Sequence, residues 1–210
     1  MVAALRVTQA ADNPEFSLVR ERAGSFMHFH LLDVPRRMWN RLFRRGAAGG
    51  HGAPAEIAYV SEYPYSGLLL HRSVLEALGL PRKDFVLYMD DIEFTRRLQT
   101  IGGALAVVAG ARIRDIHLNV SGDSKLFGAL RRWDLWRSYY LHRNKVWLDH
   151  HPLPCKGRPI TYFVNMTVWL SVLFAVALVS NRLPQFRVLV ISICDGMKGR
   201  MGLNDAFPLP

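Results

Sequence analysis

The sequence predicts an α/β fold followed by apolar helices in the C-terminal region. Short β-prone runs alternate with helical patterns in the first part of the chain, as they do in α/β domains. An uncharged, apolar stretch then occupies residues 160–180. Half of the 210 residues are hydrophobic and 21% are charged, which excludes a disordered or fibrous chain. We therefore expect an α/β region over residues 1–150 and a helical, membrane-associated region over residues 151–210.

The first pattern along the chain is a predicted strand at residues 25–32, in which His28 and His30 share one face. Two histidines at this spacing can bind a metal ion. A polar face turned outward explains them better, because no further ligand follows at a recognisable spacing.

The net charge of +10 indicates an acidic partner, such as anionic lipid, nucleic acid or a phosphate-bearing substrate. Part of this charge lies in residues 35–45, where an amphipathic basic helix suits such a partner and a solvated basic face fits equally well. Nucleic acid is not the partner we expect, because the sequence lacks zinc-ligand spacing, an RNA-recognition motif and a helix-turn-helix. Cys155 and Cys194 have no metal spacing or disulfide framework, which indicates a reduced, cytoplasm-facing protein.

The middle of the chain contains a strand that starts near residue 58 and a turn at residues 63–67. A helix follows, with Ser73 as its N-cap and Gly79 as its stop.

Residues 85–101 carry the most informative helical pattern. Asp90 and Glu93 have the spacing of a capping box at a helix start, and Glu93 with Arg97 forms an i, i+4 ion pair. Asp91 then falls at the first helical position, and its spacing from the apolar residues turns its carboxylate toward the buried side. A favourable interaction with the helix dipole explains an acid here as well as a catalytic role does.

Two predicted strands follow, at residues 104–109 and 111–118, and His117 lies at the end of the second. Residues 126–148 form a long helical pattern with an aromatic and basic stripe. This stripe suits a membrane interface, a groove for a phosphorylated ligand, or a core helix with one wet basic face.

Residues 160–180 contain no charge and are long enough to cross the roughly 30 Å hydrocarbon core of a bilayer as a helix. A transmembrane helix and a helix lying in the membrane interface both fit this stretch. A second, shorter apolar run covers residues 186–194.

Several motifs occur together in this chain: Ser-Gly-Leu-Leu-Leu-His-Arg at residues 66–72, Met-Asp-Asp-Ile-Glu-Phe at residues 89–94, and His117 after a strand. Tyr-Leu-His-Arg-Asn at residues 140–144 and Asp-Gly-Met-Lys-Gly-Arg at residues 195–200 follow. With this set, residues 58–202 resemble family 2 glycosyltransferases. The most similar types are the bacterial rhamnosyltransferases and galactofuranosyltransferases of cell-wall and surface-polysaccharide assembly.

The resemblance implies a GT-A fold and transfer of a sugar, such as rhamnose or galactofuranose, from a nucleotide-sugar donor with inversion. It implies that Asp91 is the general base, which takes the proton from the acceptor hydroxyl. Asp90 would orient the acceptor or support Asp91. His117 matches a metal-ligating histidine, so a divalent cation, Mg²⁺ or Mn²⁺, is the expected cofactor.

The remaining implied site residues lie on two other segments. Arg143 and Asn144 would lie near the donor phosphates. The loop beside the acceptor would contain Tyr65, Ser66 and Gly67. The acceptor would be a polyprenyl-linked sugar or a polysaccharide, and the enzyme would work at the cytoplasmic face of the plasma membrane as a peripheral or single-pass protein.

One departure from the family pattern is important. The Asp-x-Asp motif that holds the nucleotide and metal in the N-terminal half of family members is absent from this sequence. We expect this chain to begin partway through the catalytic domain and to bind nucleotide sugars poorly or not at all. The alternative is a non-catalytic, basic, membrane-associated interaction module derived from a truncated glycosyltransferase.

Overall fold

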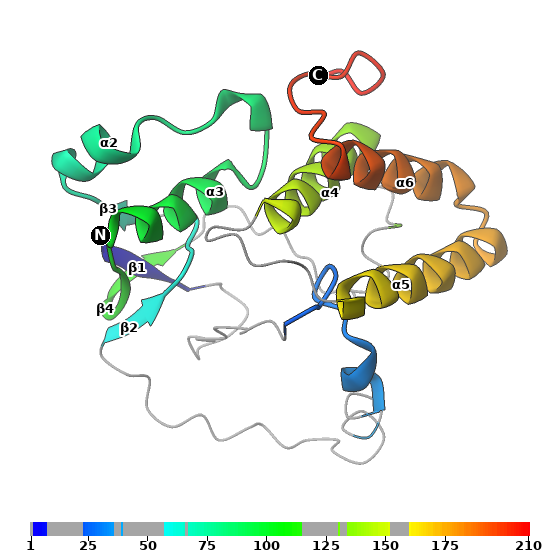
Figure 1. The fold of residues 1–210 in the computed structure, drawn as a ribbon, viewed down its shortest axis with the longest axis horizontal. Coiled ribbons are helices and arrows are strands. Elements are labelled where there is room, and N and C mark those ends of the chain that lie inside the picture. Colours follow the sequence, from blue (N-terminus) through cyan, green and yellow to red (C-terminus); the bar gives the residue numbers. More distant parts are fainter. Residues whose placement is uncertain are drawn as a thin grey trace.

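The computed structural model describes residues 2–7, 23–35, 39, 57–65, 67–114, 130, 134–151 and 160–210. Among these residues, a small sheet with two short α-helices forms one part of the fold, and three longer helices form the other (Figure 1). The basic segment predicted at residues 35–45 lies almost entirely outside the described residues.

The sheet is mixed and has the strand order β2-β4-β1-β3. β1 (Val2–Val7) runs parallel to β4 (Leu105–Arg114) and antiparallel to β3 (Leu68–Leu69). β2 (Ile57–Val60) pairs with the other edge of β4 in antiparallel orientation. The first strand of the described chain therefore lies inside the sheet, between strands that come much later in the sequence.

The two strands predicted at residues 104–109 and 111–118 are a single strand in the structure. β4 continues without interruption to Arg114, and its pairing with β1 shifts register between Ala4 and Leu5. The irregularity covers residues 109–111, where the two predicted strands would have been separated. Residues 115–129 lie outside the described residues.

Two helices accompany the sheet, α2 (Arg72–Leu78) and α3 (Asp90–Arg97). The helix predicted near residue 73 is confirmed, but its N-cap is His71, whose Nδ1 accepts the backbone N–H of Ser73. Gly79 ends it as predicted, with a left-handed φ of +71°. A buried apolar cluster joins these elements and comprises Leu78, Phe94, Leu98, Leu105 and Val107.

The strand predicted at residues 25–32 is wrong. Phe26 and Phe29 instead close a tight turn, in which Met27 and His28 have positive φ angles. A 3-10 helix at Leu31–Asp33 follows, and Nδ1 of His30 accepts the N–H of Leu32 at its start. The two histidines therefore do not share a strand face.

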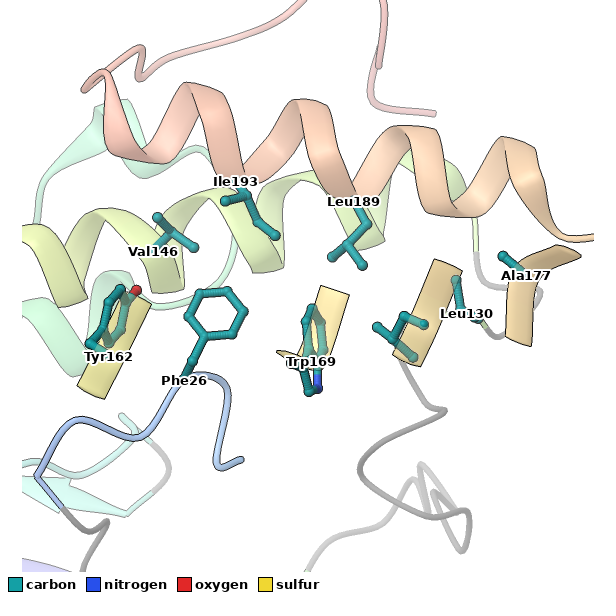
Figure 2. Close-up of a cluster of buried hydrophobic side chains, with 9 residues drawn as sticks. Phe26, Leu130, Val146, Tyr162, Trp169, Ala177, Leu189 and Ile193 are labelled. Atoms are coloured by element: carbon teal, nitrogen blue, oxygen red, sulfur yellow. The ribbon is translucent and has the colours of Figure 1, made fainter. Parts of the chain in front are cut away.

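The other part of the fold contains α4 (Leu135–His150), α5 (Ile160–Val179) and α6 (Leu183–Met197). Phe26 inserts between Tyr162 and Trp169 of α5, with ring centroids 5.3 and 5.2 Å apart (Figure 2). α6 contributes Leu189 and Ile193 to the same cluster. Burial of these large side chains holds the N-terminal turn to the helices.

α4 and α6 pack against each other at Gly196. A Cβ atom at this position would lie 2.4 Å from the carbonyl oxygen of Arg143. The region boundary predicted at residue 150 therefore falls between two helices that are in close contact.

α5 has two different faces. Its buried stripe follows helical spacing and includes Asn165, which accepts the N–H of Leu31 and donates to the carbonyl of Gly24. The opposite face exposes apolar side chains to the surroundings, among them Val164, Leu178 and Val179. By length and composition, α5 is apolar enough to cross a membrane.

Candidate functional site

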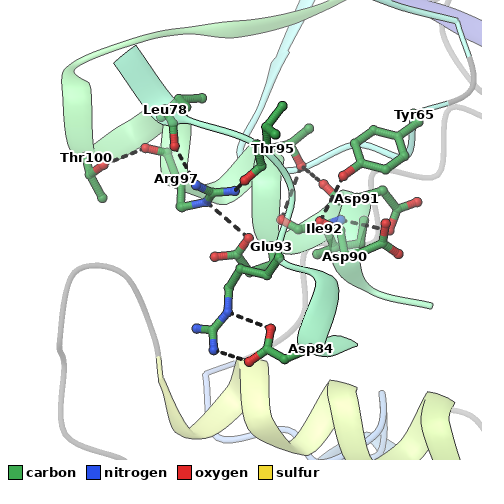
Figure 3. Close-up of polar contacts among 12 residues, drawn as sticks. Tyr65, Leu78, Asp84, Asp90, Asp91, Ile92, Glu93, Thr95, Arg97 and Thr100 are labelled. Atoms are coloured by element: carbon green, nitrogen blue, oxygen red, sulfur yellow. Dashed lines mark hydrogen bonds and ion pairs between the residues drawn. The ribbon is translucent and has the colours of Figure 1, made fainter. Parts of the chain in front are cut away.

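Two acids lie side by side at the start of α3 (Figure 3). The predicted capping box is wrong, because the N-cap is Met89, in the left-handed conformation with φ of +66°. Asp90 is the first helical residue, and the side chain of Glu93 bonds to Arg97. Asp91 caps locally instead, since its Oδ1 accepts the backbone N–H of Ile92 at 2.8 Å.

Asp91 is partly buried, as its spacing predicted. Burial is the main cause that raises the pKa of its carboxyl group above the usual range, and the negative charge of Asp90 adds to this. Backbone hydrogen bonds from Ile92, Tyr65 and Asp91 itself act in the opposite direction and favour the ionised form. The result is a carboxylate that is held in place by backbone groups and is a better proton acceptor than a free aspartate.

Glu93 stabilises α3 through an ion pair within the helix. Its carboxylate is almost fully buried and pairs with Nε of Arg97 at 3.1 Å, which confirms the predicted i, i+4 pair. The other guanidinium nitrogens of Arg97 donate to the carbonyls of Leu78 at 2.6 Å and Leu80 at 3.0 Å. Burial raises the pKa of Glu93, and the charge of Arg97 partly offsets that shift.

Tyr65, from the loop that the resemblance places beside the acceptor, lies next to the acids. The hydroxyl of Tyr65 donates to the carbonyl oxygen of Asp90 at 3.3 Å, and its ring meets Phe94 edge to face. Burial and the nearby acids raise the pKa of the Tyr65 hydroxyl. Gly67 follows with φ of +70°, whereas Ser66 is outside the described residues.

Thr95 fixes this loop to α3 and was not singled out from the sequence. Its fully buried hydroxyl accepts the N–H of Tyr63 and also lies 3.1 Å from the Tyr63 carbonyl oxygen. A threonine in a helix carries no pattern that reveals a partner 32 residues away, so only the structure could find it.

Arg143 and Asn144 are not open to solvent. Only 1% of Arg143 and none of Asn144 is exposed. The amide nitrogen of Asn144 donates to the carbonyls of Phe85, Leu87 and Tyr88 at 2.8, 2.8 and 2.9 Å. The resemblance implies a place near donor phosphates for this pair, but their polar atoms bond to each other, to the backbone that precedes Asp90 and to the carbonyl of Gly202.

The C-terminal segment contributes a second buried polar network. The hydroxyl of Tyr139 donates to Asp195 at 2.8 Å and accepts from the amide of Asn204 at 2.8 Å. Gly202 donates its N–H to the carbonyl of Asp84 at 2.7 Å. The Asp-Gly-Met-Lys-Gly-Arg motif thus begins a segment that secures α4 and the loop before α3.

His117, the expected metal ligand, lies outside the described residues. Within the described ranges, no three His, Cys, Asp or Glu side chains come together as a metal site. The adjacent carboxylates of Asp90 and Asp91 are chemically suited to a hard divalent cation but do not form a complete ligand set. Mg²⁺ or Mn²⁺ stays a prediction of the resemblance.

Comparisons with protein-family models, curated proteins and solved structures find no match for this chain. Its described residues define a mixed α/β unit with a pair of carboxylates at a helix start, joined to α4, α5 and α6.

Proposed function

We propose that this protein is an inverting glycosyltransferase, or the acceptor-side portion of one, with Asp91 as its general base. The observation that supports this most strongly is the state of the Asp91 carboxylate. It is partly buried, lies next to a second acid and accepts backbone hydrogen bonds that hold it in one orientation. A general base needs this combination of fixed geometry and raised basicity.

In the proposed reaction, an acceptor hydroxyl lies against Asp91 and loses its proton to the carboxylate as its oxygen attacks the anomeric carbon of the donor sugar. The bond from that carbon to the nucleotide diphosphate breaks, and the configuration inverts. Asp90 and the Tyr65 loop border the acceptor. A divalent cation, if bound near His117, would stabilise the charge on the departing diphosphate. The donor is a nucleotide sugar, and the acceptor is a polyprenyl-linked sugar or a polysaccharide.

We also propose that the protein works at the cytoplasmic face of the plasma membrane, with α5 lying in the interface. The buried stripe of α5 is already occupied by Phe26 and α6, while its opposite face is apolar and exposed. If α5 crossed the bilayer, α6 and the polar turn at Gly24 would have to enter the hydrocarbon with it, at a high cost for their charges and backbone groups. An in-plane helix avoids this cost.

The test is a transfer assay on the full chain with liposomes, a panel of nucleotide sugars at millimolar concentration, and a polyprenyl-diphosphate-linked acceptor. We expect weak turnover with at least one donor, because the sequence lacks an Asp-x-Asp motif. D91N should lower that turnover about 10²–10⁴-fold, the usual contribution of a general base. D205N, at an exposed C-terminal acid, is the control and should not change it.

The same assay separates the second candidate, a non-catalytic membrane-associated module. The specific observation in its favour is the exposed apolar face of α5 in a chain of net charge +10. Binding to anionic liposomes without transfer from any donor would support the module. Turnover that D91N leaves intact would reject Asp91 as the base.

A further inference from the structure

The turn that leads into α3 has an unusual backbone. Val86, Tyr88 and Met89 all have φ angles between +65° and +66°, in the left-handed region that residues with a side chain rarely adopt. For the β-branched Val86 this conformation is especially unfavourable. Three such residues directly before Asp90 persist only if the surroundings hold them there, and strain of this kind is concentrated at functional sites.

Asn144 is the group that holds this turn. Its amide nitrogen lies within hydrogen-bonding distance of three carbonyls of the turn, those of Phe85, Leu87 and Tyr88. An amide NH₂ has two hydrogens, so the three carbonyls share them and converge on one atom. Any relaxation of the turn to ordinary φ angles would rotate these carbonyls away from the amide.

Arg143 fixes the orientation of that amide. Its Nε donates to Oδ1 of Asn144 at 2.9 Å, so the amide oxygen faces the guanidinium and the NH₂ group faces the turn. Nη2 of Arg143 adds contacts to the carbonyls of Asp84 and Phe85 at 3.4 and 3.3 Å. Nη1 donates to Gly202, which itself donates to Asp84. Both side chains are fully buried, which strengthens these charge-assisted bonds.

The other side of Asp91 is also fixed. Thr95 holds Tyr63 against α3, and Tyr65 bonds to the carbonyl of Asp90. Hydrogen bonds therefore hold the start of α3 on two sides. The loop before β3 holds one side, and Asn144 holds the other by binding the turn at residues 85–88.

We propose that Asn144, oriented by Arg143, is a positioning residue for Asp91: it imposes the left-handed turn that sets the direction in which the first turn of α3 presents its carboxylate. The role of that carboxylate as a base rests on the proposed function, but its placement by Asn144 does not. Neither Asn144 nor Arg143 touches substrate in this proposal.

The experiment compares N144A with N165A. Asn165 is an equally buried asparagine that also bonds to a distant loop, through Leu31 and Gly24, and it lies on α5. Both substitutions remove backbone hydrogen bonds and should lower the thermal unfolding midpoint. The readout is the carboxyl ¹³C chemical shift of Asp91 during a pH titration of the full chain, assigned by the signal that D91N removes.

We expect the wild-type Asp91 carboxyl to titrate above the ordinary range for aspartate. N144A should return its titration toward the ordinary value as the turn relaxes and water reaches the carboxyl, whereas N165A should leave it unchanged. If N144A does not fold, R143K serves instead, because a lysine keeps the charge and loses the fork that orients the amide. An Asp91 titration that is the same in wild type, N144A and R143K would overturn the proposal.

Where transfer is detected, a second readout applies. N144A should lower kcat by about 10-fold or more with little change in KM for the acceptor, because a small misplacement of a reacting group has effects of this size. A shifted Asp91 titration in a protein that transfers no sugar would reject the glycosyltransferase proposal and leave the positioning role standing.

Discussion

Gly196 of α6 lies directly against the backbone of Arg143 in α4, so that a Cβ on Gly196 would come within 2.4 Å of the Arg143 carbonyl oxygen. Val146 closes the same space, at 2.9 Å from that Cβ. The two helices can therefore approach this closely only with glycine at this position.

G196A should destabilise the protein by about 1–3 kcal/mol, the usual cost of overpacking a close contact. For a chain of this size, each kcal/mol corresponds to roughly 2–4 °C in the unfolding midpoint. Differential scanning calorimetry measures the change. G110A is the matched control, because a Cβ at Gly110 would have nothing within 4 Å. Equal midpoints for the two variants would contradict the close packing of α4 and α6.

R97L should be strongly destabilising at neutral pH. It leaves the buried Glu93 carboxylate without its partner and removes two donors to the carbonyls of Leu78 and Leu80. Breaking a buried pair in this way costs about 3 kcal/mol. Chemical denaturation at a series of pH values measures it.

The pH dependence of R97L has a definite sign. Burial already raises the pKa of Glu93, and loss of Arg97 raises it further. A raised carboxyl pKa costs stability at pH values above the folded-state pKa, and the cost disappears as the carboxyl becomes protonated. R97L should therefore lose more stability at pH 8 than at pH 5, and adding E93Q should remove this difference. A loss that does not vary with pH would mean that Glu93 is not the unpaired group.

D91N should make the protein more stable at neutral pH. The folded-state pKa of Asp91 is raised, so its ionised form costs stability above that pKa, and asparagine avoids the cost while its Oδ1 still accepts the N–H of Ile92. The gain should shrink as the pH falls and the wild-type carboxyl becomes protonated. Thermal unfolding of D91N at pH 7.5 and pH 4 gives the answer, with D205N as the reference. A less stable D91N at pH 7.5 would show that the charge is favourable where it lies.

A double substitution on the exposed face of α5 tests membrane association. Val164 and Leu178 are 47% and 53% exposed, so V164Q/L178Q should leave stability nearly unchanged. Each apolar side chain contributes up to about 1.5–3 kcal/mol on burial, and binding to anionic liposomes should therefore fall by about 10-fold or more in a flotation assay.

L173A is the counterpart on the buried face, where Leu173 has no exposed surface. It should cost about 2–5 kcal/mol of stability and leave liposome binding of the folded protein intact. If liposome binding falls in proportion to lost stability in both variants, whichever face carries the substitution, α5 is not the contact surface.

Local patterns predicted the parts of the fold that local physics determines. The existence of α2 (Arg72–Leu78) and its stop at Gly79, the Glu93–Arg97 pair and the uncharged helix that starts at Ile160 all follow from spacing, propensity and helix stops. The inward direction of Asp91 also followed from helical spacing.

The errors occur where distant contacts override local preference. Ring contacts with Tyr162 and Trp169 determine where Phe26 lies, and no local pattern at residues 25–32 reveals them. Met89 replaces Asp90 as the helix cap because Asn144, more than fifty positions later, imposes the preceding turn. The burial of Arg143 and Asn144 was hidden for the same reason, since an Arg-Asn pair on a helix looks identical in a sequence whether it faces solvent or backbone.

The hydrogen bond between Gly202 and Asp84 joins two segments that are synthesised at different times, so it can form only after Gly202 has been made. A growing chain emerges from its N-terminal end, so the turn before α3 is made long before the segment that secures it. α5 also leaves the ribosome ahead of Gly202. In a growing chain, α5 is therefore available to a nearby bilayer before Gly202 can secure the turn that leads into the acids of α3.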